Sequence, residues 1–330
     1  MYVVARDGTG NYTSIQAAVD ALAASGGSNR TVLVRAGVYR EQVIVYPNDI
    51  RIVGEDAERT VITYDACAKD LDENGLEKGT FLSFTVIVTG SGATLENLTI
   101  RNDAGDGSVV GQAVALYAAG DRGRFLRCRL IAHQDTLFCG PMMPKVEKAI
   151  LPYASGAECQ DSVGDCPLTQ SREYFEACWI QGDVDFIFGP YRCWFEECTL
   201  FMNARGGWYT AANTPWEQPH GLIFHRCRLT GECDEGGAYL GRPWRPYART
   251  LFLDCEMDAH VSPRGFADWD EDKPITDRCG EYRTSGARAD QSTRHPRQKR
   301  LTDAEAQAIT MSAVLGGKDS WKPWEKEEIG

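Results

Sequence analysis

The clearest pattern along the chain is a frame of hydrophobic positions, Phe-x-x-Cys-x-(Leu/Ile/Met), which occurs five times with polar residues between its members. The copies are Phe125/Cys128/Leu130, Phe175/Cys178/Ile180, Phe195/Cys198/Leu200, Phe224/Cys227/Leu229 and Phe252/Cys255/Met257. Successive cysteines of the frame lie 50, 20, 29 and 28 residues apart. A constant frame with variable spacing is typical of a solenoid, in which loops of different length interrupt a repeated strand.

The spacing inside the frame predicts the geometry of each coil. A cysteine and the residue two positions later point to the same side of a strand. The phenylalanine, three positions before the cysteine, shares that side only if the chain bends between them, as at the corner of a coil. The sequence therefore predicts stacked parallel β-coils with a buried column of reduced cysteines. Chance occurrence in an aromatic-rich chain is the alternative, and five copies argue against it.

The remaining cysteines do not change this interpretation. Side chains stacked in parallel strands rarely reach the torsion that a disulfide needs, so we expect none within the column. Cys159 and Cys166 fall in a polar segment and form the only pair that we consider for a disulfide. No Cys-x-x-Cys or matching histidine spacing indicates a zinc site.

Other segments extend the same architecture. Short β-rich runs at 31–34, 42–45 and 50–53 are separated by Gly, Pro and Asn turns. The segment 93–100 resembles a further coil, with Asn97 in the place of the cysteines.

Helical patterns occur near both ends of the chain. Residues 15–24 have helical spacing after Thr13 or Ser14 as a possible N-cap, and 301–315 begin with a cap-like Thr302. No linker divides the sequence, so we expect one domain over residues 1–330, interrupted by a polar excursion at about 140–171. The predicted fold is all-β, a right-handed parallel β-helix with short helices near its N- and C-terminal ends.

Composition and charge limit the partners. The chain has 43% hydrophobic residues and a net charge of −12, so we expect neither nucleic acid nor a membrane as a partner. A methyl-esterified polyuronate is repelled less by this charge than a free one. No apolar run approaches membrane-spanning length, and no secretion signal is visible at the N-terminus. We expect a monomer located in the cytoplasm, or a secreted protein if a leader precedes this sequence.

Four motifs carry chemistry: Gly-Gln-Ala-Val-Ala-Leu at 111–116, His-Gln-Asp-Thr-Leu-Phe at 133–138, Asp-Val-Asp-Phe-Ile-Phe-Gly at 183–189 and Leu-Gly-Arg-Pro-Trp at 240–244. Asp185 stands next to the apolar run Phe186-Ile187-Phe188, where a buried carboxylate needs a partner such as Arg242. A purely structural salt bridge is the other interpretation of this pair. Gln134 and Asp135 alone are more typical of a turn or a solvated pair than of a catalytic site, so the case depends on all four motifs together.

The four motifs, in this order, resemble those of the pectin methylesterase (pectinesterase) family, and the resemblance covers nearly the whole chain. It implies hydrolysis of methyl esters of galacturonate units in pectin, without a cofactor or metal. By resemblance, Asp185 attacks the ester carbonyl, and Asp135 protonates the departing methanol and then takes a proton from water. Gln112 and Gln134 donate to the oxyanion, and Arg242 holds Asp185 ionised by lowering its pKa. Burial and the nearby charge of Asp185 are expected to raise the pKa of Asp135.

The resemblance also implies a substrate surface. Trp244 is expected to stack on a galacturonate ring, and Phe138, Phe188, Phe266 and Trp269 are further candidates for contact with substrate. Two departures from the family stand out. The two aspartates are 50 residues apart, farther than is usual, with the excursion at 140–171 between them. Phe266 follows Gly265 where the family often has a tryptophan.

Three other functions remain open from the sequence. A polysaccharide lyase or hydrolase uses the same type of solenoid, but a lyase needs a basic residue and usually a calcium cluster, which we do not find. A non-catalytic polysaccharide-binding solenoid has no use for a nucleophile and its acid. Within the esterases, the enzyme is expected to act either on polymeric pectin or preferentially on short methylated oligogalacturonides.

Overall fold

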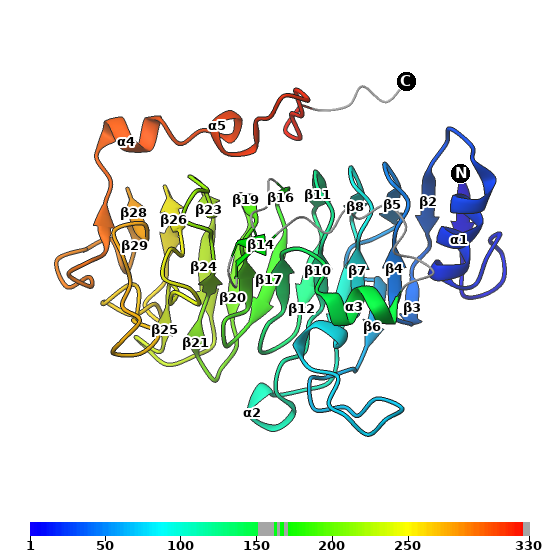
Figure 1. The fold of residues 1–330 in the computed structure, drawn as a ribbon, viewed down its shortest axis with the longest axis horizontal. Helices are drawn as coiled ribbons and strands as arrows, with labels where there is room; N and C mark the ends of the chain where they lie inside the picture. Colours follow the sequence, from blue (N-terminus) through cyan, green and yellow to red (C-terminus); the bar gives the residue numbers. More distant parts are fainter. Residues whose placement is uncertain (151–161, 164–165, 168–170, 326–330) are drawn as a thin grey trace.

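Parallel strands stack into successive coils along one axis (Figure 1). The structure is a computed structural model that describes residues 1–150, 162–163, 166–167 and 171–325. Three parallel sheets form the faces of the coils, and we call them sheets A, B and C. From β2 to β22 the chain contributes strands to sheets A, B and C in turn, and the last coils contribute to sheets A and B alone. This order confirms the predicted parallel β-helix.

Sheet A has eleven strands: β1 (Tyr2–Val4), β2 (Thr31–Val34), β5 (Arg51–Gly54), β8 (Thr94–Glu96), β11 (Gly123–Leu126), β16 (Arg172–Glu176), β19 (Arg192–Glu196), β23 (Leu222–His225), β26 (Thr250–Leu253), β28 (Gly280–Tyr282) and β30 (Lys299–Arg300). Sheet B has nine: β29 (Ser285–Gly286), β27 (Glu256–Met257), β24 (Arg228–Gly231), β20 (Thr199–Met202), β17 (Trp179–Gly182), β12 (Arg129–Ile131), β9 (Thr99–Asn102), β6 (Thr60–Tyr64) and β3 (Gly37–Arg40). Sheet C has six: β22 (Thr210–Ala212), β18 (Ile187–Gly189), β13 (Leu137–Cys139), β10 (Leu116–Ala118), β7 (Val86–Val88) and β4 (Val43–Val45). Two short pairs lie outside these sheets: β21 (Gly207–Trp208) with β25 (Ala238–Tyr239), and β14 (Ser162–Val163) with β15 (Cys166–Pro167).

The cysteine frame forms the corner between sheets A and B. The residue before each cysteine of the frame adopts a left-handed conformation, with φ between 50° and 52°, which supplies the predicted bend. The five phenylalanines stack in a ladder with ring centroids 4.4 to 4.7 Å apart. Each thiol donates to a carbonyl of the preceding coil, as Cys178 Sγ does to Phe125 O at 3.2 Å. The five cysteines are buried and free, as predicted.

One expectation about this corner is wrong. Asn97 does not take the place of a cysteine, because it occupies the left-handed corner itself, with φ of 56°. Leu98, fully buried, fills the column position instead. The considered pairing of Cys159 with Cys166 involves Cys159, which lies outside the described residues.

A helix covers the N-terminal end of the solenoid, as the sequence predicts, whereas the C-terminal helices lie along its side. Helix α1 (Ile15–Ser25) covers the first coil, and the Ser14 side chain caps it by accepting from Ala17 N. The single helix expected at 301–315 is wrong. Two short helices, α4 (Asp303–Gln307) and α5 (Met311–Leu315), form there because Thr310 caps a new start. They lead the chain back along the outer side of sheet A (Figure 1), where Val314 and Leu315 are fully buried.

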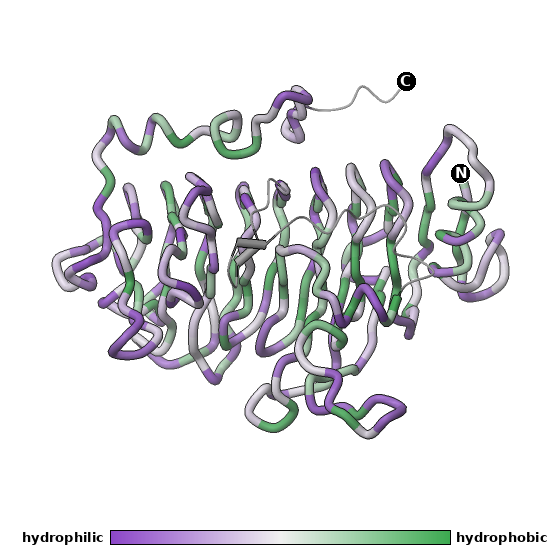
Figure 2. Tube along the Cα trace, in the orientation of Figure 1, coloured by the Kyte–Doolittle hydropathy of each residue, from purple (hydrophilic) through white to green (hydrophobic). Residues whose placement is uncertain are grey.

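Hydrophobic residues recur from coil to coil, while the outlying loops are largely hydrophilic (Figure 2). Short elements occur in the long turns beside sheet C: η1 (Thr80–Leu82) and α2 (Gly107–Val110) before its strands, and α3 (Pro144–Ala149) after β13. Among the described residues, none of the helices combines the length and apolar character needed to cross a bilayer.

Candidate active site

The two aspartates occupy equivalent positions on adjacent coils. Asp135 and Asp185 each stand two residues before the paired positions Leu137 and Ile187 of β13 and β18. Both adopt left-handed conformations, with φ of 65° and 52°, and Asp135 N donates to Val184 O at 3.1 Å. Because neighbouring strands lie about 4.8 Å apart, this repeated turn brings both residues to the same edge of sheet C.

Arg242 binds Asp185 through a two-pronged ion pair. Its Nε donates to Asp185 Oδ1 at 2.9 Å and its second terminal nitrogen to Oδ2 at 2.7 Å. The guanidinium carbon lies 3.8 Å from the ring centroid of Trp208 and 4.3 Å from that of Trp269. Stacking between two indoles fixes the plane of the guanidinium and therefore the orientation of the carboxylate. Sequence reasoning missed Trp208, whose position beside Arg242 depends on the fold.

The surroundings of Asp135 and Asp185 give the two carboxyl groups different pKa values. Burial, with the charge of Asp185 as the next cause, raises the pKa of Asp135 well above its ordinary value. The pKa of Asp185 is also raised by burial, but hydrogen bonds and charge from Arg242 oppose that rise. Arg242 thus acts to lower the pKa of Asp185, as expected, but desolvation outweighs it and leaves that pKa above its ordinary value. The order of the two groups is unaffected: Asp135 holds its proton more tightly than Asp185.

Gln134 directly precedes Asp135 on the approach to β13, and Gln112 lies one coil earlier, on the approach to β10. Gln134 O accepts from Ala113 N at 3.1 Å, and Gln112 O accepts from Ala68 N at 2.8 Å, so both backbones are held. Neither side-chain carboxamide hydrogen-bonds to another described residue, and both residues are partly exposed. Their N–H groups are available for a ligand.

His133 and Asp183 form a second acid–base pair that connects the same turns. This pair was not identified from the sequence. Asp183 is fully buried, and its Oδ2 lies 2.8 Å from His133 Nδ1. Its Oδ1 accepts from Val184 N at 2.8 Å. The hydrogen bond to Asp183 raises the pKa of His133. Asp183, two residues before Asp185, thus has its own partner, although its charge still contributes to raising the pKa of Asp135.

The expected substrate-binding aromatics divide into two groups. Trp244 and Trp269 are half-buried at the edge of an outer hydrophobic cluster, and Arg242 covers one ring face of Trp269. Phe138 and Phe188 face outward on sheet C but are only 2% and 4% exposed. Phe266, 1% exposed, belongs to the interior core. We therefore correct the expectation for these three phenylalanines: Phe266 packs inside the coils, and the other two lie under a cover that is described below.

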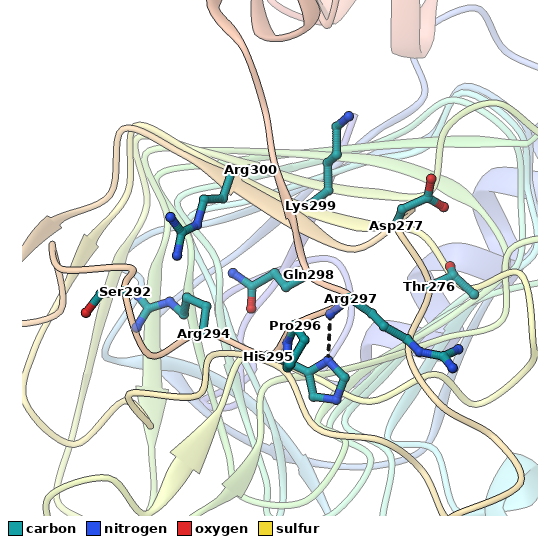
Figure 3. A pocket seen from close by; sticks show the side chains of 10 residues that line it. All are labelled: Thr276, Asp277, Ser292, Arg294, His295, Pro296, Arg297, Gln298, Lys299 and Arg300. Carbon is teal, nitrogen blue, oxygen red and sulfur yellow. Dashed lines mark hydrogen bonds between the residues drawn. The ribbon is translucent and has the colours of Figure 1, made fainter.

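A shallow cleft of about 910 Å³ lies at the last coils and contains none of these residues (Figure 3). Its basic side chains point in different directions, and several already have partners, such as Arg294 with Glu281 and Lys299 with Glu305. The cleft is lined by Thr276, Asp277, Ser292, Arg294, His295, Pro296, Arg297, Gln298, Lys299 and Arg300. It does not contribute to the candidate active site.

The described residues offer no evident set of metal ligands. No group of three or more His, Cys, Asp or Glu side chains among the residues described could hold a metal ion. A calcium-dependent lyase calls for such a cluster, so this alternative is not favoured.

Comparisons with known proteins agree with the geometry. A family model for pectinesterases matches residues 1–142 and 159–318. Pectinesterase 31 from Arabidopsis thaliana is 31% identical over 331 residues, covering 98% of this chain and 94% of the relative. Pectin methylesterase from carrot is 28% identical with a TM-score of 0.76, covering 96% and 93% of the two chains. A pectin methylesterase solved in complex with a hexasaccharide is 28% identical with a TM-score of 0.75, covering 98% of both chains.

Proposed function

The chain belongs to the pectinesterase family, and from this premise we propose that Asp185 and Asp135 carry out the hydrolysis. The protein is a carboxylic ester hydrolase that removes methyl esters from galacturonate units of pectin. The observation that carries the assignment of residues is the contrast between two neighbouring carboxyl groups. One is bound by a guanidinium at two oxygens, and the pKa of the other is raised well above its ordinary value by burial and by its neighbour's charge.

In the first half-reaction, an Asp185 oxygen attacks the carbonyl carbon of the methyl ester. The carbonyl oxygen becomes an oxyanion, which accepts hydrogen bonds from the carboxamides of Gln112 and Gln134. Asp135 gives its proton to the methoxy oxygen as the C–O bond breaks, and methanol leaves. The galacturonate acyl group is then joined to Asp185 as a mixed anhydride.

In the second half-reaction, the ionised Asp135 removes a proton from a water molecule, whose oxygen attacks the acyl carbon. The bond to Asp185 breaks, Asp185 recovers its negative charge, and Asp135 is protonated again. The product is a free galacturonate carboxyl group, which loses its proton to solvent. Neutral glutamine donors suit this site, because a positive charge in their place would lower the pKa of Asp135.

Each side chain in this proposal comes from one copy of the chain, and we propose a single-domain monomer as the acting unit. Light scattering of the purified protein checks this proposal. A dimer that loses activity on dilution in step with its dissociation would contradict it.

The reaction type is tested by three readouts on methyl-esterified pectin in the presence of a chelator. We expect methanol release without new unsaturated chain ends and without new reducing ends. Unsaturated ends would identify a lyase, and reducing ends a glycoside hydrolase. Binding without any of the three products would identify a non-catalytic protein.

A further inference from the structure

A row of outward-facing residues crosses sheet C beside the active site. Strand register places Ile44, Ile87, Tyr117, Phe138 and Phe188 side by side from β4 to β18. The residues that alternate with them belong to the interior core. An outward-facing row would be expected to meet solvent or substrate, yet Ile87 and Tyr117 are fully buried and Phe138 is 2% exposed.

Two turns on opposite edges of sheet C cover this row. The segment after β13 contributes Met142, Val146 and Ile150, which are 5%, 0% and 5% exposed. The segment before β7 contributes Phe81 and Phe84 to the same cluster. Val146 of α3 belongs to the same cluster as Ile44 of β4 and Ile87 of β7, and Figure 1 shows α3 near this part of the solenoid.

Polar contacts join the two turns. Lys145 Nζ, on α3, donates to Glu77 O of the opposite turn at 2.6 Å. Tyr117, on the sheet below, donates to Pro141 O at 2.6 Å and accepts from Met143 N at 2.9 Å. The cover is therefore fixed to the sheet and to the far edge, so that it spans the full width of the outer face.

The two covering turns come from the coils of β7 and β13, so both precede Asp185 and β18 along the axis. Gln112 precedes β10, Asp135 precedes β13 and Asp185 precedes β18, so these residues follow one another along the axis. The next strand beyond Gln112 is β7, about 4.8 Å farther along, and Phe81 and Phe84 of the cover directly precede it. On the opposite side, past β22, Trp216 and Tyr247 are 65% and 45% exposed with ring centroids 5.0 Å apart. A sugar chain that follows the axis therefore has accessible surface on the C-terminal side of the site. On the N-terminal side it meets the cover.

We propose that residues 141–150 end the path of the substrate on the N-terminal side of the site. The enzyme then hydrolyses esters close to one end of a galacturonate chain and prefers short methylated oligomers to the interior of polymeric pectin. This inference rests on the proposed function, since it concerns the substrate of that same site.

The direct test uses the unaltered protein and fully methylated oligogalacturonides of defined length, labelled at the reducing end. Mass spectrometry locates the first ester lost. We expect it at a fixed distance from one end whatever the length, and a rate per ester that falls as chains lengthen toward the polymer. Losses spread through the interior, at an equal rate per ester on oligomer and polymer, would overturn the proposal. Absence of methanol from every substrate would instead refute the esterase assignment.

A pair of variants tests the cover itself. Val146→Asp places a charge in the buried contact of α3, whereas Lys148→Asp introduces the same residue on the exposed face of the same helix. We expect Val146→Asp to raise the ratio of polymer to oligomer activity about tenfold, equivalent to a gain of about 1.4 kcal/mol in binding beyond the cover. Lys148→Asp should leave the ratio unchanged. An unchanged ratio in a folded Val146→Asp protein would contradict the proposal, and if that variant does not fold, the positional measurement decides.

Discussion

Replacement of Arg242 by glutamine tests the electrostatic arrangement most informatively. The change removes two charge-assisted hydrogen bonds, 2.9 and 2.7 Å long, to a carboxylate that is 6% exposed. Breaking a buried ion pair by removing one partner costs about 3–5 kcal/mol. Each 1.4 kcal/mol by which ionisation of Asp185 becomes harder lowers the rate about tenfold on the acid limb of the pH profile.

We therefore expect Arg242→Gln to lose about 10²–10³-fold of activity at acidic pH and to recover part of it as the pH rises. Arg242 also acts to lower the pKa of Asp135, so its loss raises that pKa as well. The whole pH–rate profile should move to higher pH. Arg242→Lys keeps the charge but loses the planar fork, and its profile should move less.

Stability gives an independent check on the same variant. Without Arg242, burial alone acts on Asp185, and its folded-state pKa stands farther above the unfolded value near 3.9. Such a group binds its proton more tightly in the folded state, so stability is lost as the pH rises above the unfolded value. Methanol release and thermal unfolding measured across the pH range test both effects. A profile that coincides with that of the unaltered protein, in a folded variant, would refute the reasoning.

Further predictions concern the other residues of the site and the core. Gln112→Leu and Gln134→Leu should each lower kcat by about 10²–10³-fold with little change in KM. A change in KM alone would contradict their role as donors to the oxyanion. Asp183→Asn removes a charge that raises the pKa of Asp135, so the decline of activity at alkaline pH should begin at lower pH; an unmoved alkaline limb would contradict this. Phe195→Ala interrupts the phenylalanine ladder and should cost about 3–5 kcal/mol in denaturant unfolding, with the pH profile unchanged.

Much of the fold was predictable because it depends on short-range spacing. The bend between Phe195 and Cys198 follows from side-chain direction alone, and the structure places a left-handed residue, Glu197, at that corner. At 93–100 the frame predicts Asn97 in the place of the buried cysteines, but Asn97 occupies the corner and Leu98 takes the buried position. Local sequence identifies a coil more reliably than the exact residue that faces its interior.

The site was predictable where one residue required another. A carboxylate beside Phe186, Ile187 and Phe188 needs a counter-charge, and Arg242 provides it. The partner of His133 was missed, because nothing in the sequence brings Asp183 to it across a 50-residue separation.

The cover over Phe138 was missed for a similar reason. A strand pattern shows that a residue faces outward but not what packs on it. Here the covering residues, such as Val146, come from the excursion that follows β13. Long turns decide the surroundings of a site on a solenoid, and their positions are the least evident part of the sequence.

Methanol release by Asp185→Asn, beside the unaltered protein and Asp135→Asn, tests the central assignment most directly. An amide of the same shape keeps the packing but cannot attack the ester, so the account predicts a loss of about 10⁴-fold or more with thermal unfolding near that of the unaltered protein. A folded Asp185→Asn protein that releases methanol within about tenfold of the normal rate would contradict the account, because the acyl group would then have to be carried elsewhere.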